Sequence, residues 1–255
     1  MILKKGQITV FVIIGIILII SLFLIFKLQN TETEGITETG VQKVIELDAS
    51  SINLFVQECV NMIGADSIDI AGKQGGYTDL NENMLATFYG FFGYAYDEGT
   101  NKLLSKEEMS NQISLYVETF LPDCINDFSI FKSFDILQGN VKAETLIGAN
   151  DVSIKVNYPL KISKLGSETT ISDFISKYDV RLSHIYDIVD KTANRMILDE
   201  GWIDVTYMSD FDIQYEIYPH NETILIFSIT DDKSILNNKP YQFLFANRLI
   251  EDENE

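Results

Sequence analysis

The sequence predicts an α+β protein in which an N-terminal transmembrane helix precedes one mixed ectodomain of amphipathic helices and antiparallel β-hairpins. Three observations predict this fold class. Residues 8–26 carry no charged side chain and consist almost entirely of Ile, Leu, Val and Phe. Apolar residues recur every three or four positions over 52–63, which is the period of an amphipathic helix. Over 152–162 they alternate with polar residues, which is the period of a half-buried strand.

The uncharged segment is long enough to cross a bilayer. At about 1.5 Å per residue it approaches the roughly 30 Å hydrocarbon core of a membrane. Lys4 and Lys5 precede it, and basic residues favour the cytoplasmic side. A cleaved secretory signal would have a shorter apolar core followed by a small-x-small site, which the sequence after Ser21 lacks. We therefore expect an uncleaved signal anchor with a cytoplasmic N-terminus.

This topology divides the chain into four parts. The cytoplasmic tail and transmembrane anchor take residues 1–27, a polar tether takes 28–40, an extracytoplasmic α+β domain takes 41–250 and an acidic tail takes 251–255. We expect a single-pass protein of the cell membrane whose C-terminal domain is extracellular. Its partners are membrane lipid, contacted by the N-terminal helix, and other proteins or further copies that assemble through the same helix.

The composition excludes a nucleic acid partner. The chain has a formal net charge of −19, with 19 basic and 38 acidic residues. Such a surface repels phosphate groups. It suits basic partners or cations, and it is equally the surface of a protein that is simply solvated.

The ectodomain is predicted to begin with an amphipathic helix over 41–63 that ends at or beyond Gly64. The glycine-rich residues 72–76 then form a turn. A phosphate-binding Walker loop is excluded there, because Gln74 follows Lys73 in place of Ser or Thr and because a helix precedes it instead of a strand.

Aromatic residues dominate 88–96, which we predict to be extended. Their rings could pack against a helix or stack on a sugar, and the sequence leaves both uses open. A capping box formed by Ser105 and Glu108 then starts the next helix, and Pro122 marks its end or a further turn. The remaining predicted elements are strands at 141–147, 152–162 and 169–180, a helix at 182–197, a hairpin of 211–218 with 223–230, and a last strand at 241–247.

The two cysteines, Cys59 and Cys124, are assigned to two different helical segments, with Cys59 inside its helix and Cys124 just past the other. Outside the cytoplasm two such thiols can form a disulfide bond. Their apolar surroundings also suit two buried free thiols, so both states stay open. We expect no metal site, because neither cysteine has a histidine or a second cysteine nearby.

No catalytic, cofactor-binding or metal-binding residue is predicted. His184, near the start of a helix, and His220, in a hairpin turn, have no accompanying Gly-x-Ser-x-Gly or His-Glu-x-x-His motif. The acidic pairs at 97–98 and 231–232 lack the spaced oxygen ligands of a calcium loop, so we interpret them as solvated turns. Asn221 begins an Asn-x-Thr glycosylation acceptor in an exposed turn.

The segment around Gly6 and Gln7 resembles the archaeal type IV pilin-like (class III) signal, in which basic residues and a glycine precede the cleaved bond and a hydrophobic helix follows. This resemblance implies processing between Gly6 and Gln7. Pilins of this type usually carry Glu at the fifth mature position, where this chain has Phe11.

The chain as a whole resembles a group of uncharacterised archaeal membrane-anchored proteins. The matching motifs are Gly6-Gln7-Ile8-Thr9-Val10-Phe11, Val56-Gln-Glu-Cys59, Gly72-Lys-Gln-Gly-Gly-Tyr77, Leu121-Pro-Asp-Cys124, Val156-Asn-Tyr-Pro-Leu160 and Phe243-Leu-Phe-Ala-Asn247. The resemblance implies a surface location and no activity. We therefore predict a membrane-anchored binding or surface-assembly protein. The alternatives are a minor pilin-like subunit and a cell-surface hydrolase, and the hydrolase would need a cleft at 88–96.

Overall fold

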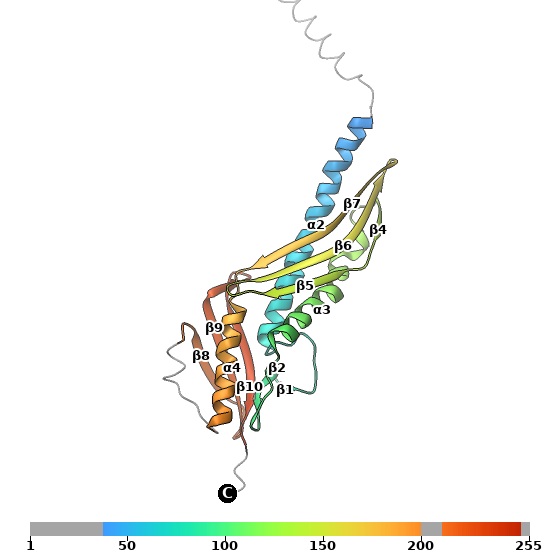
Figure 1. Cartoon of the computed structure of the whole chain (residues 1–255). Helices are drawn as coiled ribbons and strands as arrows, with labels where there is room; N and C mark the ends of the chain where they lie inside the picture. The colour runs from blue at the N-terminus through green and yellow to red at the C-terminus, as the bar shows by residue number, and fades with distance from the viewer. Residues whose placement is uncertain (1–37, 200–210, 251–255) are drawn as a thin grey trace, which may run out of the picture. The chain divides into compact units, whose positions relative to one another are not determined.

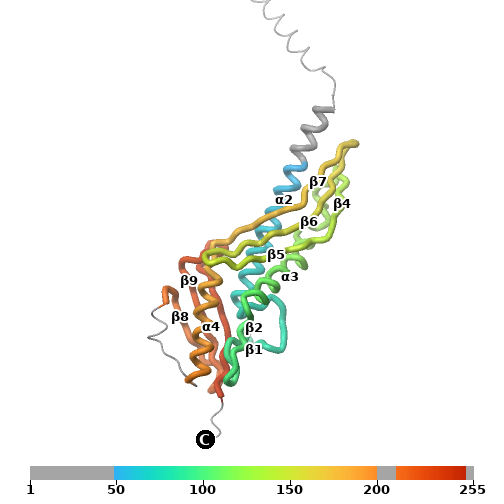
Figure 2. The backbone as a smooth tube through the Cα atoms, in the orientation of Figure 1, coloured from blue at the N-terminus to red at the C-terminus, as the bar shows by residue number. Residues whose placement is uncertain are grey.

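A computed structural model describes residues 38–199 and 211–250, with side chains described from residue 49. The chain divides into two units, Met1–Leu47 and Asp48–Glu255. In the first unit only the start of helix α2 (Glu38–Lys73) is described. The second unit combines the rest of α2 with two β-sheets and the helices α3 (Lys106–Ile125), η1 (Asn126–Phe128) and α4 (Leu182–Leu198), and its path is traced in Figure 2.

The first sheet has four strands, all antiparallel, which follow one another along the chain (Figure 1). Strand β6 (Val152–Lys164) is central. Strand β7 (Ser167–Tyr178) lies along one side of it, and β5 (Lys142–Ile147) and β4 (Asp135–Gln138) share the other side. The alternation predicted over 152–162 is confirmed, because its apolar members are buried while the residues between them are largely exposed.

The second sheet has six strands taken from both ends of the domain. Its order is β1 (Met84–Thr87), β2 (Gly90–Asp97), β10 (Lys239–Arg248), β9 (Ile224–Leu236) and β8 (Gln214–Pro219), and β3 (Thr100–Asn101) also pairs with β2. Strands β2 and β10 are parallel, and the other pairs are antiparallel.

The predicted fold class is therefore wrong as stated, although the mixed α+β content is present. Among the described residues, no helix combines the length and the apolar character that a membrane span requires. The longest of them, α2, is interrupted by charges such as Glu58, Asp66 and Asp69. The segment 8–26, for which we predicted a transmembrane helix, lies outside the described residues, as do most of the tether and the tail 251–255.

Two further corrections concern local elements. The sheets are not built from antiparallel hairpins alone, because β2 and β10 are joined in parallel. Helix α2 already begins at Glu38, within the predicted tether. It continues past Gly64 to Lys73, which agrees with the longer of the two predicted ends. A Cβ atom at residue 64 would lie 2.2 Å from the hydroxyl oxygen of Tyr178. The glycine therefore allows the helix to approach β7 closely.

Helices α2 and α3 cover the inner face of the four-stranded sheet. The Tyr178 hydroxyl donates to the carbonyl oxygen of Asn61 in α2 at 2.8 Å. From α3, the Ser114 hydroxyl donates to Thr145 of β5 at 2.8 Å. Helix α4 contacts the second sheet, where Asn101 of β3 donates to Asp190 at 3.0 Å. One continuous apolar core joins these layers.

Candidate functional site

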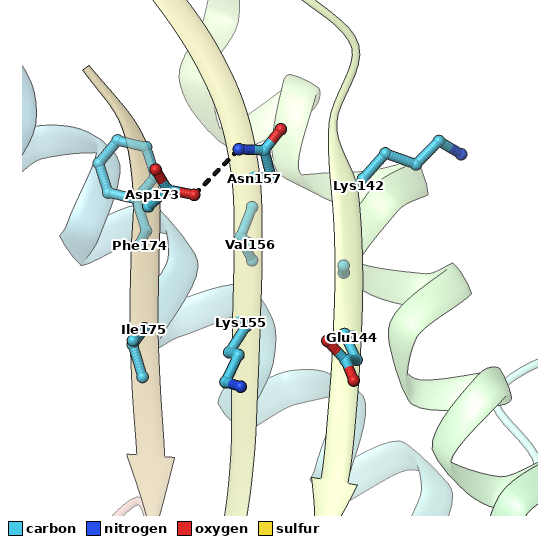
Figure 3. A pocket seen from close by; sticks show the side chains of 9 residues that line it. Lys142, Glu144, Lys155, Val156, Asn157, Asp173, Phe174 and Ile175 are labelled. Carbon is cyan, nitrogen blue, oxygen red and sulfur yellow. Dashed lines mark hydrogen bonds between the residues drawn. The ribbon is translucent and has the colours of Figure 1, made fainter.

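The candidate site is the face of the four-stranded sheet that points away from α2 and α3, which we call the outer face. Because successive side chains of a strand point to opposite sides, the residues between the buried ones must face outward. The outer face carries Asp135, Leu137, Lys142, Glu144, Leu146, Lys155, Asn157, Lys161, Glu168, Thr170, Asp173, Ile175 and Lys177. Figure 3 shows its centre, with the helices behind the strands.

A shallow depression of about 310 Å³ lies at this centre. Its polar members are Lys142, Glu144, Lys155, Asn157 and Asp173. The pairing of β6 with β7 shifts just after Asn157. Such a bulge bends a strand locally and re-aims its side chains.

One hydrogen-bonded carboxylate borders the depression. Asn157 Nδ2 donates to Asp173 Oδ1 at 2.9 Å (Figure 3), and the Ser172 hydroxyl donates to the other carboxylate oxygen. These two hydrogen bonds, from Ser172 first and Asn157 second, hold the pKa of Asp173 below its ordinary value. The group is therefore a fixed anion at neutral pH, and it is unsuited to donating a proton there.

The lysines of the outer face differ in their partners. Lys142 pairs with Glu118 at 3.2 Å, Lys161 with Glu168 at 2.9 Å and Lys177 with Asp151 at 2.6 Å. Within the described part of the chain, the ammonium group of Lys155 has no such partner, although the residue is exposed at the centre of the face.

The charge of this face contrasts with that of the whole chain. It carries four lysines against four carboxylates and is therefore neutral, in a protein of net charge −19. The arrangement offers paired and unpaired cations on a rigid sheet, together with hydrogen-bonding groups and apolar side chains, and it has no histidine or thiol. It is therefore suited to binding.

The predicted cysteines are brought together. Cys59 and Cys124 form a disulfide bond between α2 and α3, with Cα atoms 5.8 Å apart. Cys124 lies inside α3, because this helix continues through Pro122 to Ile125. The bridge therefore joins two helices that both support the candidate face from behind.

The histidines are not brought together into a catalytic site. His184 lies in the first turn of α4, while His220 follows β8 in the turn of a hairpin. Within residues 38–199 and 211–250, the buried Nε2 atom of His184 finds no hydrogen-bond partner. Among the described residues no group of three or more His, Cys, Asp or Glu side chains is placed to hold a metal ion.

The two acidic pairs are not simple solvated turns. Oδ1 of Asp97 lies 3.2 Å from Nε of Arg248. Nη1 of the same arginine lies 3.7 Å from Oε1 of Glu98. Asp231 is fully buried, so the prediction of a solvated turn is wrong for this residue.

Asp231 is buried because it forms a two-pronged ion pair with Arg181, at the start of α4. The Nε and Nη2 atoms of Arg181 donate to the two carboxylate oxygens at 2.9 and 2.5 Å. Ser234 donates a further hydrogen bond to the same carboxylate and accepts one from the Arg181 backbone N–H. Burial alone would raise the pKa of Asp231, but the hydrogen bonds from Arg181 and Ser234 outweigh it and lower the pKa below its ordinary value.

The predicted modification sites are only partly described. Asn221 lies exposed in the turn between β8 and β9, where its side-chain oxygen accepts hydrogen bonds from the backbone N–H groups of Thr223 and Ile224 at 3.0 and 2.7 Å. Gly6 and Gln7, the predicted processing site, lie outside the described residues.

The aromatic segment forms the β1–β2 hairpin, and its rings divide by position. Phe92 and Tyr94 are buried, as packing predicts. At the tip of the hairpin, however, Phe88 is 98% exposed and Tyr89 is 89% exposed. These two rings therefore project from the hairpin and do not line the wall of a cleft.

Comparisons with known proteins add no relative: no family model matches the chain, and neither a curated protein nor a solved structure matches it significantly. The resemblances to archaeal pilin-like signals and to archaeal membrane-anchored proteins therefore stay predictions. The outer face was not predicted as a site. The available signal was the placement of Lys155 and Lys161 at polar positions of the most regular strand in an otherwise acidic sequence.

Proposed function

We propose that this protein acts outside the cytoplasm by binding or assembling with other macromolecules through the outer face. The observation that carries the proposal is that no described residue covers this sheet face. The face presents Lys155, which has no ion-pair partner among the described residues, in a chain of net charge −19. Complementary charge guides partners together and rejects those of like charge. The outer face is thus suited to an acidic protein surface.

The disulfide between Cys59 and Cys124 supports the extracytoplasmic part of the proposal. Such bonds persist mainly in oxidising compartments, because cytosolic thiols are kept reduced. Location at the cell membrane remains a prediction that rests on the hydropathy of residues 8–26.

Protease treatment of intact cells tests the location. We expect the protease to digest the domain before the cells are opened. We also expect no alkylation of Cys59 and Cys124 in denatured, unreduced protein. Protection of the domain in intact cells, together with two alkylated thiols, would contradict the proposal.

A photo-crosslinking amino acid at position 155 tests the binding surface. The matched control is position 216, which is an exposed residue of β8 in the second sheet. In intact cells we expect a discrete cross-linked product from position 155 that the additional change Lys161→Glu weakens. Equal products from both positions, or none from position 155, would argue against the outer face as the contact surface.

A pilin-like subunit is the second candidate, because Gly6 and Gln7 precede an uncharged segment. Mass spectrometry of the mature N-terminus tests it. A chain that begins at Gln7 supports the candidate, whereas an intact N-terminus removes its main argument. The hydrolase alternative needs a cleft at 88–96, whereas the exposed rings of Phe88 and Tyr89 form a hairpin tip.

A further inference from the structure

Strand β7 is an edge strand, and its length makes that edge unusual. It is 12 residues long and pairs with β6 on one side only, in the part of the chain that the structure describes. An edge strand presents a row of backbone N–H and C=O groups that can pair with another strand. Natural proteins usually interrupt such edges with proline, lysine or a covering segment.

The edge of β7 is only lightly protected. The strand contains no proline, and its one lysine, Lys177, is its next-to-last residue. From α2, Gln57 Nε2 donates to the carbonyl oxygen of Ile175 at 3.1 Å. Since this carbonyl points away from β6, Gln57 caps one group of the free edge. The half of the strand that begins at Ser167 receives no such cap from the described residues.

The sequence of β7 is complementary to itself in the antiparallel direction. If two copies met about a two-fold axis between Ser172 and Asp173, Glu168 of one copy would lie opposite Lys177 of the other. Both side chains point to the outer face, and opposite charges across two strands stabilise their pairing. The axis repeats this contact, so each interface contains it twice.

The other positions agree with this register. Thr170 would oppose Ile175, both on the outer face, so Gln57 would have to release the carbonyl oxygen of Ile175. Ile171 would oppose Phe174, both directed toward the core. A shift by one residue would set outward side chains against inward ones. A shift by two would restore the faces but would separate the charged pair.

The intramolecular ion pairs extend the same pattern. Lys161 lies 2.9 Å from Glu168, and Asp151 lies 2.6 Å from Lys177. Across the joined edges, the order would be Lys161 and Glu168 of one copy followed by Lys177 and Asp151 of the other. Glu168 and Lys177 would therefore each lie between two charges of opposite sign.

We propose that the β7 edges of two copies of this chain pair antiparallel in this register and join their four-stranded sheets into one. This inference deepens the assembly role proposed above, because it names a second copy as a partner and makes the two outer faces continuous. It does not depend on which other partner the outer face binds.

Cysteine cross-linking of the full chain tests the register. We would make Glu168→Cys and Lys177→Cys variants with tags of different size, mix them, and oxidise them in membranes. A disulfide-linked heterodimer is expected in the mixture, because residues 168 and 177 of different copies lie opposite each other. Each variant alone should give none, because identical positions would lie roughly 30 Å apart at about 3.3 Å per residue.

The matched control is Glu216→Cys, an exposed position in the edge strand of the other sheet. A link that forms equally with this control, or the absence of any link specific to the mixture, would overturn the proposal.

Charge exchange gives a second, independent test. Glu168→Lys or Lys177→Glu alone places like charges opposite each other and should raise the dimer dissociation constant about tenfold, which is near 1.4 kcal/mol. The double variant restores the opposite charges and should recover dimerisation. Sedimentation of the full chain in detergent measures the dimer dissociation constant of the single and double variants. Circular dichroism verifies that each variant is folded. A monomeric wild type would overturn the proposal, and so would a double variant no better than the singles.

The two proposals fail separately. Lys142→Glu, on β5 and away from β7, should weaken photo-crosslinking from position 155 and leave the mixed-cysteine dimer unchanged. If the β7 dimer is absent but photo-crosslinking at 155 still captures a partner, only the edge proposal falls.

Discussion

The two sheets of this domain are assembled in opposite ways. In the four-stranded sheet, β4 to β7 follow one another in sequence and are joined by short turns. In the six-stranded sheet, β2 near the start of the domain lies beside β10 near its end. Closing a short loop loses little chain entropy, whereas pairing distant segments loses more before any contact forms. The second sheet therefore depends more on specific long-range contacts.

Two buried polar contacts provide such long-range contacts in the second sheet. At the irregularity in the parallel pair, the backbone N–H of Tyr96 donates to the side-chain oxygen of Asn247 at 3.0 Å. Asp231 of β9 holds Arg181 at the start of α4. The four-stranded sheet instead keeps its charged groups on an exposed face. Buried polar groups are costly when unpaired, so the two sheets should respond differently to single substitutions.

The largest expected effect lies behind the four-stranded sheet. Replacing Cys59 and Cys124 together by serine should lower the free energy of unfolding by about 4 kcal/mol, because the bridge restricts the unfolded chain over a separation of 65 residues. Urea unfolding measures the loss, and the wild type in reductant should match the variant. A stability that does not change in either case would show that the local hairpins and helices need no covalent link.

Asp231→Asn should cost about 3 kcal/mol, because it leaves the largely buried Arg181 with only the exposed Asp212, at 3.7 Å, as a counter-charge. The pKa of Asp231 is lowered in the folded state, so its contribution is complete at neutral pH and is lost as the pH falls below its ordinary value of 3.8. The difference between wild type and variant should therefore shrink in acid, as urea unfolding at several pH values would show.

Asp232, the exposed neighbour of Asp231, provides the control for the ion pair of Asp231 with Arg181. Asp232→Asn should change the stability by less than about 0.5 kcal/mol. If both variants lose equal stability, burial of the pair is not the cause.

Asn247→Ala should cost about 2 kcal/mol, because it leaves the buried N–H of Tyr96 without an acceptor. Asn157→Ala, which removes an exposed hydrogen bond on the outer face, should cost much less. Thermal unfolding of both variants sharpens the comparison of the sheets. Equal losses would contradict the comparison. They would mean that the buried hydrogen bond of Asn247 contributes no more to stability than the exposed hydrogen bond of Asn157.

The smallest expected effect is at the centre of the outer face. Lys155→Ala should change the free energy of unfolding by no more than about 0.5 kcal/mol, because the side chain is exposed and has no ion-pair partner among the described residues. A clear gain in stability would indicate that the exposed lysine weakens the fold, as expected of a residue kept for binding. A large loss would instead make it structural.

Local sequence determined the elements whose signals repeat over a few residues. The alternation in β6 marks a strand with one buried face, and the capping box of Ser105 and Glu108 is present at the start of α3. The two-residue and helical periods were informative there because burial of one face follows directly from the repeat. The same sequence also placed polar side chains on the outer face, although it did not show that the face stays uncovered.

Only the tertiary structure decided which distant segments meet. It paired β2 with β10, buried Asp231 beside Arg181, joined Cys59 to Cys124, and left the tip of the aromatic hairpin exposed. No local pattern distinguishes a buried aspartate from a solvated one, or an aromatic ring in the core from one at a hairpin tip. These outcomes depend on which neighbours pack there, since burial and pairing are properties of the assembled core and not of the residue itself.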